Sequence, residues 1–257
     1  MSRVLITGSS DGLGLAAATL LIGQGNEVIG HARSDSRAAD LRRQAPGIAG
    51  VVVGDLASAA ATRSVADQVN ALGRLDAVIH NAALGYRERD RAVTADGHEQ
   101  LLTVNVLAPY LLTALIERPA RLVYLSSGLH SGGTPSLADL DWERRPWDSF
   151  QAYSDSKLFD VALAFAIARR WPDVLSNAVT PGWVPTKMGG PGAPDDLAAG
   201  AVTQAWLAVS DEPAAAVSGA YFFHQRPGEA HPAARSPEFQ DELTSALATL
   251  TGVKLPA

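Results

Sequence analysis

Cysteine is absent from the 257-residue sequence. Without a thiol, the chain cannot form a disulfide framework, a thiolate nucleophile or a cysteine-based zinc site. Any chemistry must therefore use other side chains, and we predict no metal site.

Dense basic clusters and membrane-length apolar runs are also absent. The chain has 21 basic and 27 acidic residues and a formal net charge of −6, so we expect no nucleic-acid partner. Uncharged stretches such as 101–116 are shorter than the ~18 to 20 apolar residues that cross a bilayer, which argues against a membrane partner. The N-terminus lacks the pattern of an export signal, and we expect a cytoplasmic protein.

What is present is the composition of a packed globular protein, with 47% hydrophobic and 19% charged residues. At this length, one domain spanning 1–257 is expected. Short β-rich runs alternate with longer helical patterns, which is typical of repeated βαβ units. We therefore predict an α/β protein of the Rossmann type, with a doubly wound, seven-stranded parallel sheet flanked by helices.

The predicted elements follow this alternation. The strands cover 3–7, 27–31, 50–54, 76–80, 121–126, 174–179 and 219–223. The helices cover 13–25, 36–44, 58–72, 94–118, 152–170, 195–210 and 237–250. Two irregular stretches, at about 128–150 and 181–200, are predicted to be substrate loops, because long irregular segments in a compact domain often line a binding site.

A glycine-rich segment joins the first predicted strand to the first helix. It reads Thr7-Gly8-Ser9-Ser10-Asp11-Gly12-Leu13-Gly14. Small residues let the backbone approach a pyrophosphate, and the free amides and positive dipole end of the helix stabilise its negative charge. This strand-to-helix setting favours a dinucleotide site over an ordinary tight turn.

The end of the second predicted strand indicates which dinucleotide binds. A carboxylate there usually holds the ribose hydroxyls of NAD, whereas this chain has His31-Ala32-Arg33. A guanidinium can bind a phosphate in bidentate fashion, and no carboxylate in this segment repels it. We therefore predict NADP(H) in preference to NAD(H); the alternative is that Arg33 is only a solvated surface charge.

A tyrosine and a lysine open a long predicted helix in the segment Tyr153-Ser154-Asp155-Ser156-Lys157. Their separation of four residues puts the phenol and the ammonium on one helix face. Because an unperturbed tyrosine has a pKa of about 10, proton exchange near neutrality requires a neighbouring cation that favours the phenolate. We predict that Lys157 supplies this cation; the alternative is an exposed surface pair.

Together these segments resemble the short-chain dehydrogenase/reductase family, over matching motifs that extend from Thr7 to Thr186. The resemblance implies a catalytic tetrad of Asn105, Ser127, Tyr153 and Lys157. In that tetrad Ser127, favoured over Ser126, hydrogen-bonds the substrate oxygen and Tyr153 exchanges the proton. Lys157 also holds the nicotinamide ribose, and Asn105 keeps a water relay in place.

The same resemblance implies a cofactor site. Its residues would be Thr7, Gly8, Ser9, Ser10, Asp11, Gly12, Leu13, Gly14, Arg33, Asp55, Leu56, Asn81, Ala82, Ala83, Tyr153, Lys157, Pro181, Gly182, Val184 and Thr186. Two positions depart from the family pattern. Ala83 replaces the last glycine of the Asn-Ala-Gly motif, and Asp11 stands where many NADP-using relatives have a basic residue.

The segment between Ser127 and Tyr153 is longer than in compact members of the family. A similar lengthening occurs in the branch that resembles retinol dehydrogenases and protochlorophyllide reductases. Residues 221–224 resemble anthracycline (daunorubicin C-13) ketoreductases. Aromatic and apolar loop residues favour a bulky hydrophobic ketone, aldehyde or alcohol as substrate, although each could instead be a packing anchor. The candidate contacts are Leu84, Tyr86, His130, Trp142, Trp147, Trp183 and Met188.

The sequence thus predicts an NADP(H)-dependent oxidoreductase that transfers a hydride between nicotinamide and a carbonyl or secondary alcohol. The alternative is a catalytically silent NADP-binding protein on the same fold, because a fold alone does not prove activity. A sugar-nucleotide epimerase is disfavoured by the glycine spacing, and a serine hydrolase by the lack of a Gly-x-Ser-x-Gly elbow. Monomer, homodimer and homotetramer all stay open.

Overall fold

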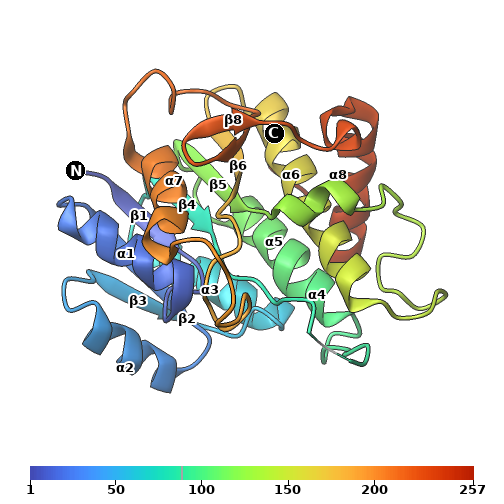
Figure 1. Ribbon diagram of the computed structural model, residues 1–257, viewed down its shortest axis with the longest axis horizontal. Helices are drawn as coiled ribbons and strands as arrows, with labels where there is room; N and C mark the ends of the chain where they lie inside the picture. The colour runs from blue at the N-terminus through green and yellow to red at the C-terminus, as the bar shows by residue number, and fades with distance from the viewer. Residues whose placement is uncertain (88) are drawn as a thin grey trace.

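The computed structural model describes residues 1–87 and 89–257. They form one sheet with the strand order β3-β2-β1-β4-β5-β6-β7-β8 (Figure 1). The strands are β1 (Arg3–Ile6), β2 (Glu27–Ala32), β3 (Gly50–Val53), β4 (Ala77–His80), β5 (Arg121–Leu125), β6 (Leu175–Thr180), β7 (Tyr221–Phe223) and β8 (Arg226–Gly228). Strands β1 to β7 run parallel, so the predicted doubly wound α/β fold is confirmed.

The eighth strand corrects the predicted count of seven. β8 pairs antiparallel with β7 through a tight hairpin, in which His224 and Gln225 have φ values of 47° and 60°. Positive φ at both central residues is the geometry of a two-residue hairpin turn. No turn signal marks this hairpin in the sequence, because neither residue is glycine and the strand is only three residues long.

Helices cover both faces of the sheet. They are α1 (Gly12–Gly23), α2 (Asp35–Gln44), α3 (Ala59–Ala71), α4 (Gln100–Leu102), the π-helix η1 (Thr103–Leu107), α5 (Ala108–Leu115), the 3-10 helix η2 (Gly128–Gly132), α6 (Ser149–Arg170), α7 (Leu197–Val209), the 3-10 helix η3 (Pro232–Arg235) and α8 (Pro237–Thr251). None of these helices combines the length and the apolar character needed to cross a membrane.

The alternation of side chains along β1 shows how the two faces are filled. Val4 and Ile6 belong to the core that contains residues of α1 and α7. Leu5, between them, belongs to the core formed with α3, α5 and α6. Successive side chains of a strand point to opposite faces, and both faces of a parallel sheet are buried. Figure 1 shows α1 and α7 together on one face.

The helix predicted over 94–118 is interrupted and shorter. It begins at Gln100, where the buried Glu99 carboxylate accepts the backbone N–H groups of Leu101 and Leu102 at 2.7 Å each. It then widens into the π-helix η1, which ends two residues before Pro109. Proline has no N–H, and its ring crowds the carbonyl of the preceding turn, which accounts for the break.

The two predicted loops lie at the carboxyl edge of the sheet, after β5 and β6. The first is shorter than expected, because α6 begins at Ser149 rather than at 152; the Asp148 carboxylate accepts the N–H groups of Phe150 and Gln151. The second precedes α7, which starts at Leu197. In open α/β sheets, ligands bind at this edge where the strand order reverses, here between β1 and β4.

Candidate active site

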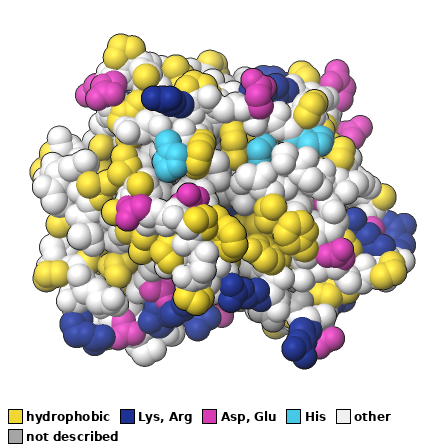
Figure 2. Space-filling view, viewed as in Figure 1, with side chains coloured by type: hydrophobic (Ala, Val, Ile, Leu, Met, Phe, Trp, Pro, Cys, Tyr) yellow, Lys and Arg dark blue, Asp and Glu magenta, His cyan; other side chains and the backbone are white. Residues whose placement is uncertain are grey.

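A cleft of about 1070 Å³ runs along the carboxyl ends of the parallel strands. Its walls are the glycine-rich turn after β1, the ends of β2 and β3, and the loops after β4, β5 and β6. Hydrophobic side chains gather across the middle of the face shown in Figure 2, with Lys and Arg side chains below them.

The shape of the glycine-rich turn depends on its glycines and on hydrogen bonds from Asn81. Gly8 and Gly12 have φ values of 63° and 53°, a region that L residues disfavour. A Cβ on Gly14 would lie 2.5 Å from both the Gly8 carbonyl oxygen and Asn81 Nδ2. Asn81 Nδ2 donates to the carbonyls of Thr7 and Gly8 at 2.9 and 3.2 Å, so the residue that follows β4 fixes the shape of the turn.

Two residues proposed for cofactor contact support the turn with their side chains. Thr7 Oγ1 accepts the N–H groups of Asn81 and Ala82 at 2.9 and 3.0 Å. Ser9 Oγ accepts the N–H of His31 at 2.9 Å. Thr7 and Ser9 are buried and lie outside the lining of the cleft. Their side chains therefore support the turn rather than face the cleft.

His31 joins three segments of the chain. The sequence analysis noted it only because the end of this strand has no carboxylate. Its Nδ1 accepts the N–H of Gly8 at 3.0 Å, and its Nε2 donates to the Gly54 carbonyl at 2.8 Å. These two bonds require the neutral imidazole, because Nδ1 must be unprotonated. Burial lowers the pKa of His31, in agreement with that state.

Two arginines line one end of the cleft. Arg33, which the sequence proposed for the ribose phosphate, is exposed there. Arg37, which the sequence analysis missed, donates from Nη2 to the Ser10 carbonyl at 3.2 Å and to Asp11 Oδ2 at 2.7 Å. Lys187 Nζ also donates to Asp11 Oδ2, at 2.6 Å. The Asp11 carboxylate is therefore matched by two cations. Asp55 and Leu56 lie at the same end of the cleft.

Tyr153 and Lys157 both line the cleft from α6. The Lys157 ammonium lies 5.8 Å from the centre of the Tyr153 ring. Burial raises the pKa of Tyr153 above its usual value, and the Asp160 and Tyr86 charges act in the same direction. The Lys157 charge and hydrogen bonding to Ser127 oppose that rise. The predicted pair thus shares one buried helix face rather than an exposed one.

The two serines after β5 have different surroundings. Ser126 is buried, and its Oγ donates to the Lys157 carbonyl at 2.8 Å. Ser127 is half-buried, and its Oγ accepts the N–H of Leu129 at 3.2 Å. Because the Ser126 hydroxyl already has a backbone partner in α6, Ser127 is the better candidate for a substrate oxygen.

Asn105 lies in the π-helix, behind the cleft wall. Its Oδ1 accepts the N–H of Leu84 at 2.8 Å. Its Nδ2 donates to the Leu84 carbonyl at 3.1 Å and to Ser156 Oγ at 3.0 Å. Asn105 therefore fastens the loop after β4 to α6. Single π-turns within helices are frequent at functional sites, but this one has no clear signal in a single sequence apart from Pro109.

The candidate substrate contacts divide into two groups. Leu84, Tyr86, His130, Trp183 and Met188 line the cleft, together with Phe150, Tyr221 and Phe223, which the sequence analysis had not proposed. The Tyr86 ring packs edge-on against Tyr153 and Phe150, at 5.4 Å in each case.

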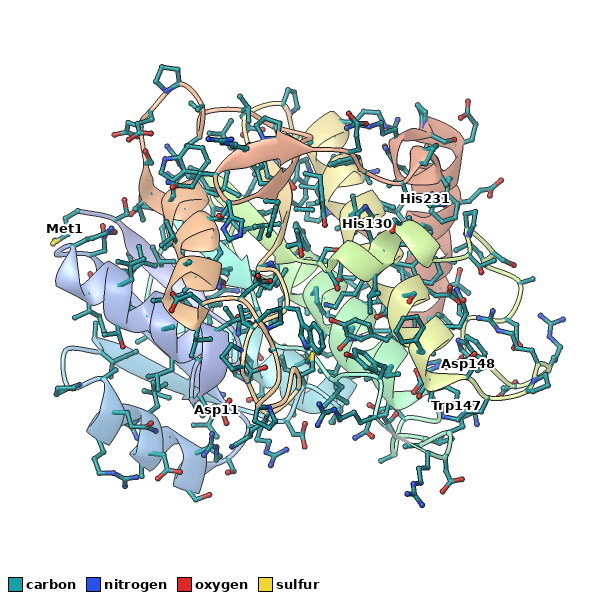
Figure 3. All side chains as sticks on the ribbon, viewed as in Figure 1. Met1, Asp11, His130, Trp147, Asp148 and His231 are labelled. Carbon is teal, nitrogen blue, oxygen red and sulfur yellow. The ribbon has the colours of Figure 1, made fainter. Side chains whose placement is uncertain are left out.

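Trp142 and Trp147 are not part of that lining. Their rings pack edge to face at 5.6 Å, and the Arg145 guanidinium lies 3.4 Å above Trp142. Figure 3 shows Trp147 beside Asp148 at the start of α6, far to the right of Asp11. For this pair the structure supports the packing alternative, since both rings brace the loop rather than face a ligand.

His130 is held by two other segments. Its Nδ1 donates to the Ser127 carbonyl at 2.7 Å, and its Nε2 accepts the N–H of His231 at 3.2 Å (Figure 3). Its ring lies 4.4 Å from that of Tyr221. His130 therefore fixes the backbone of Ser127 relative to β7.

The segment after β6 folds over the glycine-rich turn. Gly182 has a φ of 84°, and the N–H of Trp183 donates to Asp195 Oδ2 at 2.6 Å. A Cβ on Gly12 would lie 3.4 Å from Thr186 Cγ2. Pro181, Gly182, Val184 and Thr186 all line the cleft.

Comparison with known proteins decides the family. Residues 2–128 match the short chain dehydrogenase family. The short-chain dehydrogenase chyC of Penicillium rubens is 42% identical over 264 residues, covering 100% of both chains. Two further relatives are each 35% identical over 72% of this chain. They are a protein named as daunorubicin C-13 ketoreductase DnrU of Streptomyces sp., 67% of which is covered, and human retinol dehydrogenase 14, 62% of which is covered.

This chain belongs to the short-chain dehydrogenase/reductase family. Solved structures agree in fold. An uncharacterised Mycobacterium paratuberculosis protein has a TM-score of 0.87 at 27% identity, covering 100% of this chain and 96% of its own. A metagenomic blue fluorescent protein in complex with NADPH has a TM-score of 0.69 at 22% identity, covering 86% and 95%.

As a short-chain dehydrogenase/reductase, the protein is an oxidoreductase that acts on alcohol or carbonyl groups and binds a nicotinamide cofactor. The residues present fit such a group. The Asp11 side chain makes no cap to the first turn of α1, so that turn keeps amides available for a pyrophosphate. When bound, the nicotinamide supplies or accepts the hydride.

Proposed function

We propose that this family member is an NADP(H)-dependent carbonyl reductase for a bulky hydrophobic ketone or aldehyde, working in reverse as an alcohol dehydrogenase. The observation that carries the proposal is the layout of the cleft. Arg33 and Arg37 line it just after β2, whereas Tyr153 lines it from α6, which follows β5, three strands away in the sheet, and lies within an apolar and aromatic wall.

The preference for NADP(H) rests on charge at the end of β2. His31 is neutral and turned toward the backbone, while Arg33 and Arg37 offer guanidinium groups to a ribose phosphate. The Asp11 charge, which would repel that phosphate, is already paired with Arg37 and Lys187. A structure of similar fold that is named as an NADPH complex supports the same preference.

Proton transfer follows from the position of Tyr153. A hydride that reaches a carbonyl carbon leaves negative charge on the oxygen, and a preplaced hydroxyl stabilises this charge in the transition state. We assign that part to Ser127, and the donation of the proton to Tyr153. Lys157 stabilises the phenolate that is left behind. In alcohol oxidation the phenolate takes the proton back.

The substrate class rests on the wall of the cleft. Phe150, Trp183 and Phe223 are exposed at its mouth, with 49%, 53% and 41% of their surface accessible. Exposed aromatic side chains that border a cleft are suited to bind large apolar ligands. The ketoreductase and the retinol dehydrogenase among the relatives are named for substrates of this kind.

The test is a turnover assay with purified protein. NADPH or NADH is incubated with a panel of aromatic ketones and long apolar aldehydes, and nicotinamide fluorescence is followed. We expect turnover of bulky members with NADPH. Tyr153→Phe is expected to lower kcat by roughly 10²- to 10⁴-fold, with an unchanged Kd for NADPH.

Two results would contradict the proposal. Wild-type rates in Tyr153→Phe would exclude the proton-transfer role. Tight NADPH binding without turnover of any panel member would instead favour a catalytically silent NADP-binding protein.

A further inference from the structure

A buried carboxylate lies directly behind the proposed catalytic lysine. Asp160 follows Lys157 by three residues on α6 and is fully enclosed. Its Oδ2 accepts from Lys157 Nζ at 2.7 Å. Its Oδ1 has no hydrogen-bond partner among the described residues. A buried carboxylate with one oxygen unpaired is costly to keep, and at this distance its negative charge acts strongly on the lysine.

The Lys157 ammonium is shared among three neighbours. It donates to the Leu125 carbonyl at 2.8 Å and to Asp160, and it lies 5.8 Å from the Tyr153 ring. The carboxylate is therefore closer to the ammonium than the phenol ring is. In a buried site, a negative charge in direct contact offsets much of the field that a cation exerts on a third group.

We propose that Asp160 is a positioning residue that holds Lys157 in place and balances its charge, so that Tyr153 stays protonated at neutral pH and acts as a proton donor. The inference rests on the proposed function and specifies its direction. Reduction consumes a protonated phenol: the carbonyl carbon gains the hydride of the reduced nicotinamide, and the oxygen gains the phenol proton. Oxidation requires the phenolate, which takes the hydroxyl proton as the hydride leaves.

Two buried titratable groups near this pair, Tyr124 and His80, are neutral near pH 7. Tyr124 of β5 shares a hydrogen bond of 2.7 Å with Thr113, which is joined in turn to His80 of β4 at 3.1 Å. Burial raises the pKa of Tyr124 and lowers that of His80 to about 3.

On the cleft side, Tyr86 packs against Tyr153 at 5.4 Å. Burial raises the pKa of Tyr221 of β7 to about 12. Burial also raises the pKa of Asp160 to about 6, against the opposing pull of Lys157. Above that pH, Lys157 and Asp160 are the charged pair that decides how readily Tyr153 loses its proton.

The deciding variant is Asp160→Asn, which keeps the shape of the side chain and removes its charge. Loss of that charge should lower the pKa of Tyr153. We expect the phenolate absorbance, measured without cofactor as the difference between each protein and its Tyr153→Phe counterpart, to appear about one pH unit lower, a tenfold change in proton affinity. The pH profile of kcat/KM for alcohol oxidation should move in the same direction.

Asp155→Asn is the matched control. Asp155 is also buried on α6 and pairs with Arg145 at 2.9 Å, but its carboxylate accepts from Thr134, Arg145 and Gln151 rather than from Lys157. Asp155→Asn should leave the phenolate titration and the pH profile of kcat/KM as they are in the wild type. Asp160→Glu, which keeps the negative charge, should give wild-type behaviour in both measurements. If Asp160→Asn does not fold, Asp160→Ala, which leaves room for water beside the ammonium, takes its place with the same expected shift.

Two results would overturn the inference: an unchanged phenolate titration in the Asp160 variants, or an equal shift in Asp155→Asn. Because the absorbance titration needs no turnover, either result is separate from a failure of the proposed reaction. Wild-type protein that reduces no carbonyl would overturn the proposed function and leave the electrostatic effect on Tyr153 measurable.

Discussion

Lys187 and Asp11 tie the loop after β6 to the glycine-rich turn, with 2.6 Å between Lys187 Nζ and Asp11 Oδ2. The two residues are 176 positions apart in the sequence. Since Thr186 also lies against Gly12, these contacts hold the loop against the glycine-rich turn at the proposed cofactor site.

Lys187→Ala should release this loop. Because exposed ion pairs contribute at most about 1 kcal/mol, we expect NADPH to dissociate up to about fivefold faster, with little change in the melting temperature. Stopped-flow fluorescence measures the dissociation rate. Lys254→Ala, at an exposed position outside the cleft lining, is the control. An unchanged rate in Lys187→Ala would show that the ion pair does not restrain the loop.

Arg33→Ala tests the phosphate-binding end of the cleft. A charge-assisted hydrogen bond contributes about 1.5 to 3 kcal/mol, so Kd for NADPH should rise by about tenfold or more. Kd for NADH should change little, since NADH has no ribose phosphate. Arg43→Ala, on exposed α2 surface and paired with Asp40, should leave both constants unchanged. Titration calorimetry gives all values, and equal losses for the two cofactors would contradict the predicted preference.

Gly14→Ala should disrupt the glycine-rich turn. The new Cβ would lie 2.5 Å from the Gly8 carbonyl oxygen and 2.9 Å from Ser9 Cα, so the backbone must shift. We expect loss of measurable NADPH binding and a lower melting temperature. Gly23→Ala, in the same helix with nothing within 4 Å of the added Cβ, should be neutral or stabilising by up to about 1 kcal/mol. Normal NADPH affinity in Gly14→Ala would refute the packing argument.

His80 should make the protein sensitive to acid. Burial lowers its pKa to about 3 in the folded chain, whereas the unfolded value is about 6.5. Between these values the unfolded chain binds a proton that the folded chain does not. The free energy of unfolding should therefore fall as pH falls through this window, by at most about 1.4 kcal/mol per pH unit.

Urea denaturation of wild type and His80→Gln over this pH range isolates the effect, because contributions from other groups are common to both proteins. The difference between the two free energies should change with pH in the stated direction. His224→Gln, at an exposed position, should follow the wild type. Parallel curves for wild type and His80→Gln would exclude His80 as the cause.

The fold could be predicted because its signals are local. Apolar runs such as Val4 to Ile6 specify strands, and their alternation with helical segments specifies a parallel sheet. The interruption of the helix near Asn105 could not be predicted in the same way. It depends on the buried Glu99 cap and on the place of the π-turn, both of which depend on packing.

The candidate site was predictable only in part, for the same reason. Tyr153 and Lys157 are neighbours on one helix face, so their spacing alone brought them together. Arg37 lies 26 residues from its partner Asp11 and carries no motif. Trp142 is an aromatic loop residue of the kind that can contact an apolar ligand, but its ring packs against Trp147 and Arg145.

Local signals were enough to predict the seven parallel strands, the presence of the glycine-rich segment between β1 and α1, and the tyrosine-lysine pair, because each of these depends on residues within a few positions of one another. Tertiary structure decided which cations neutralise Asp11, which aromatic rings face the cleft and how Lys157 is balanced between Tyr153 and Asp160. These outcomes depend on distances of a few ångströms between packed segments, and hydrophobic periodicity carries no information at that scale.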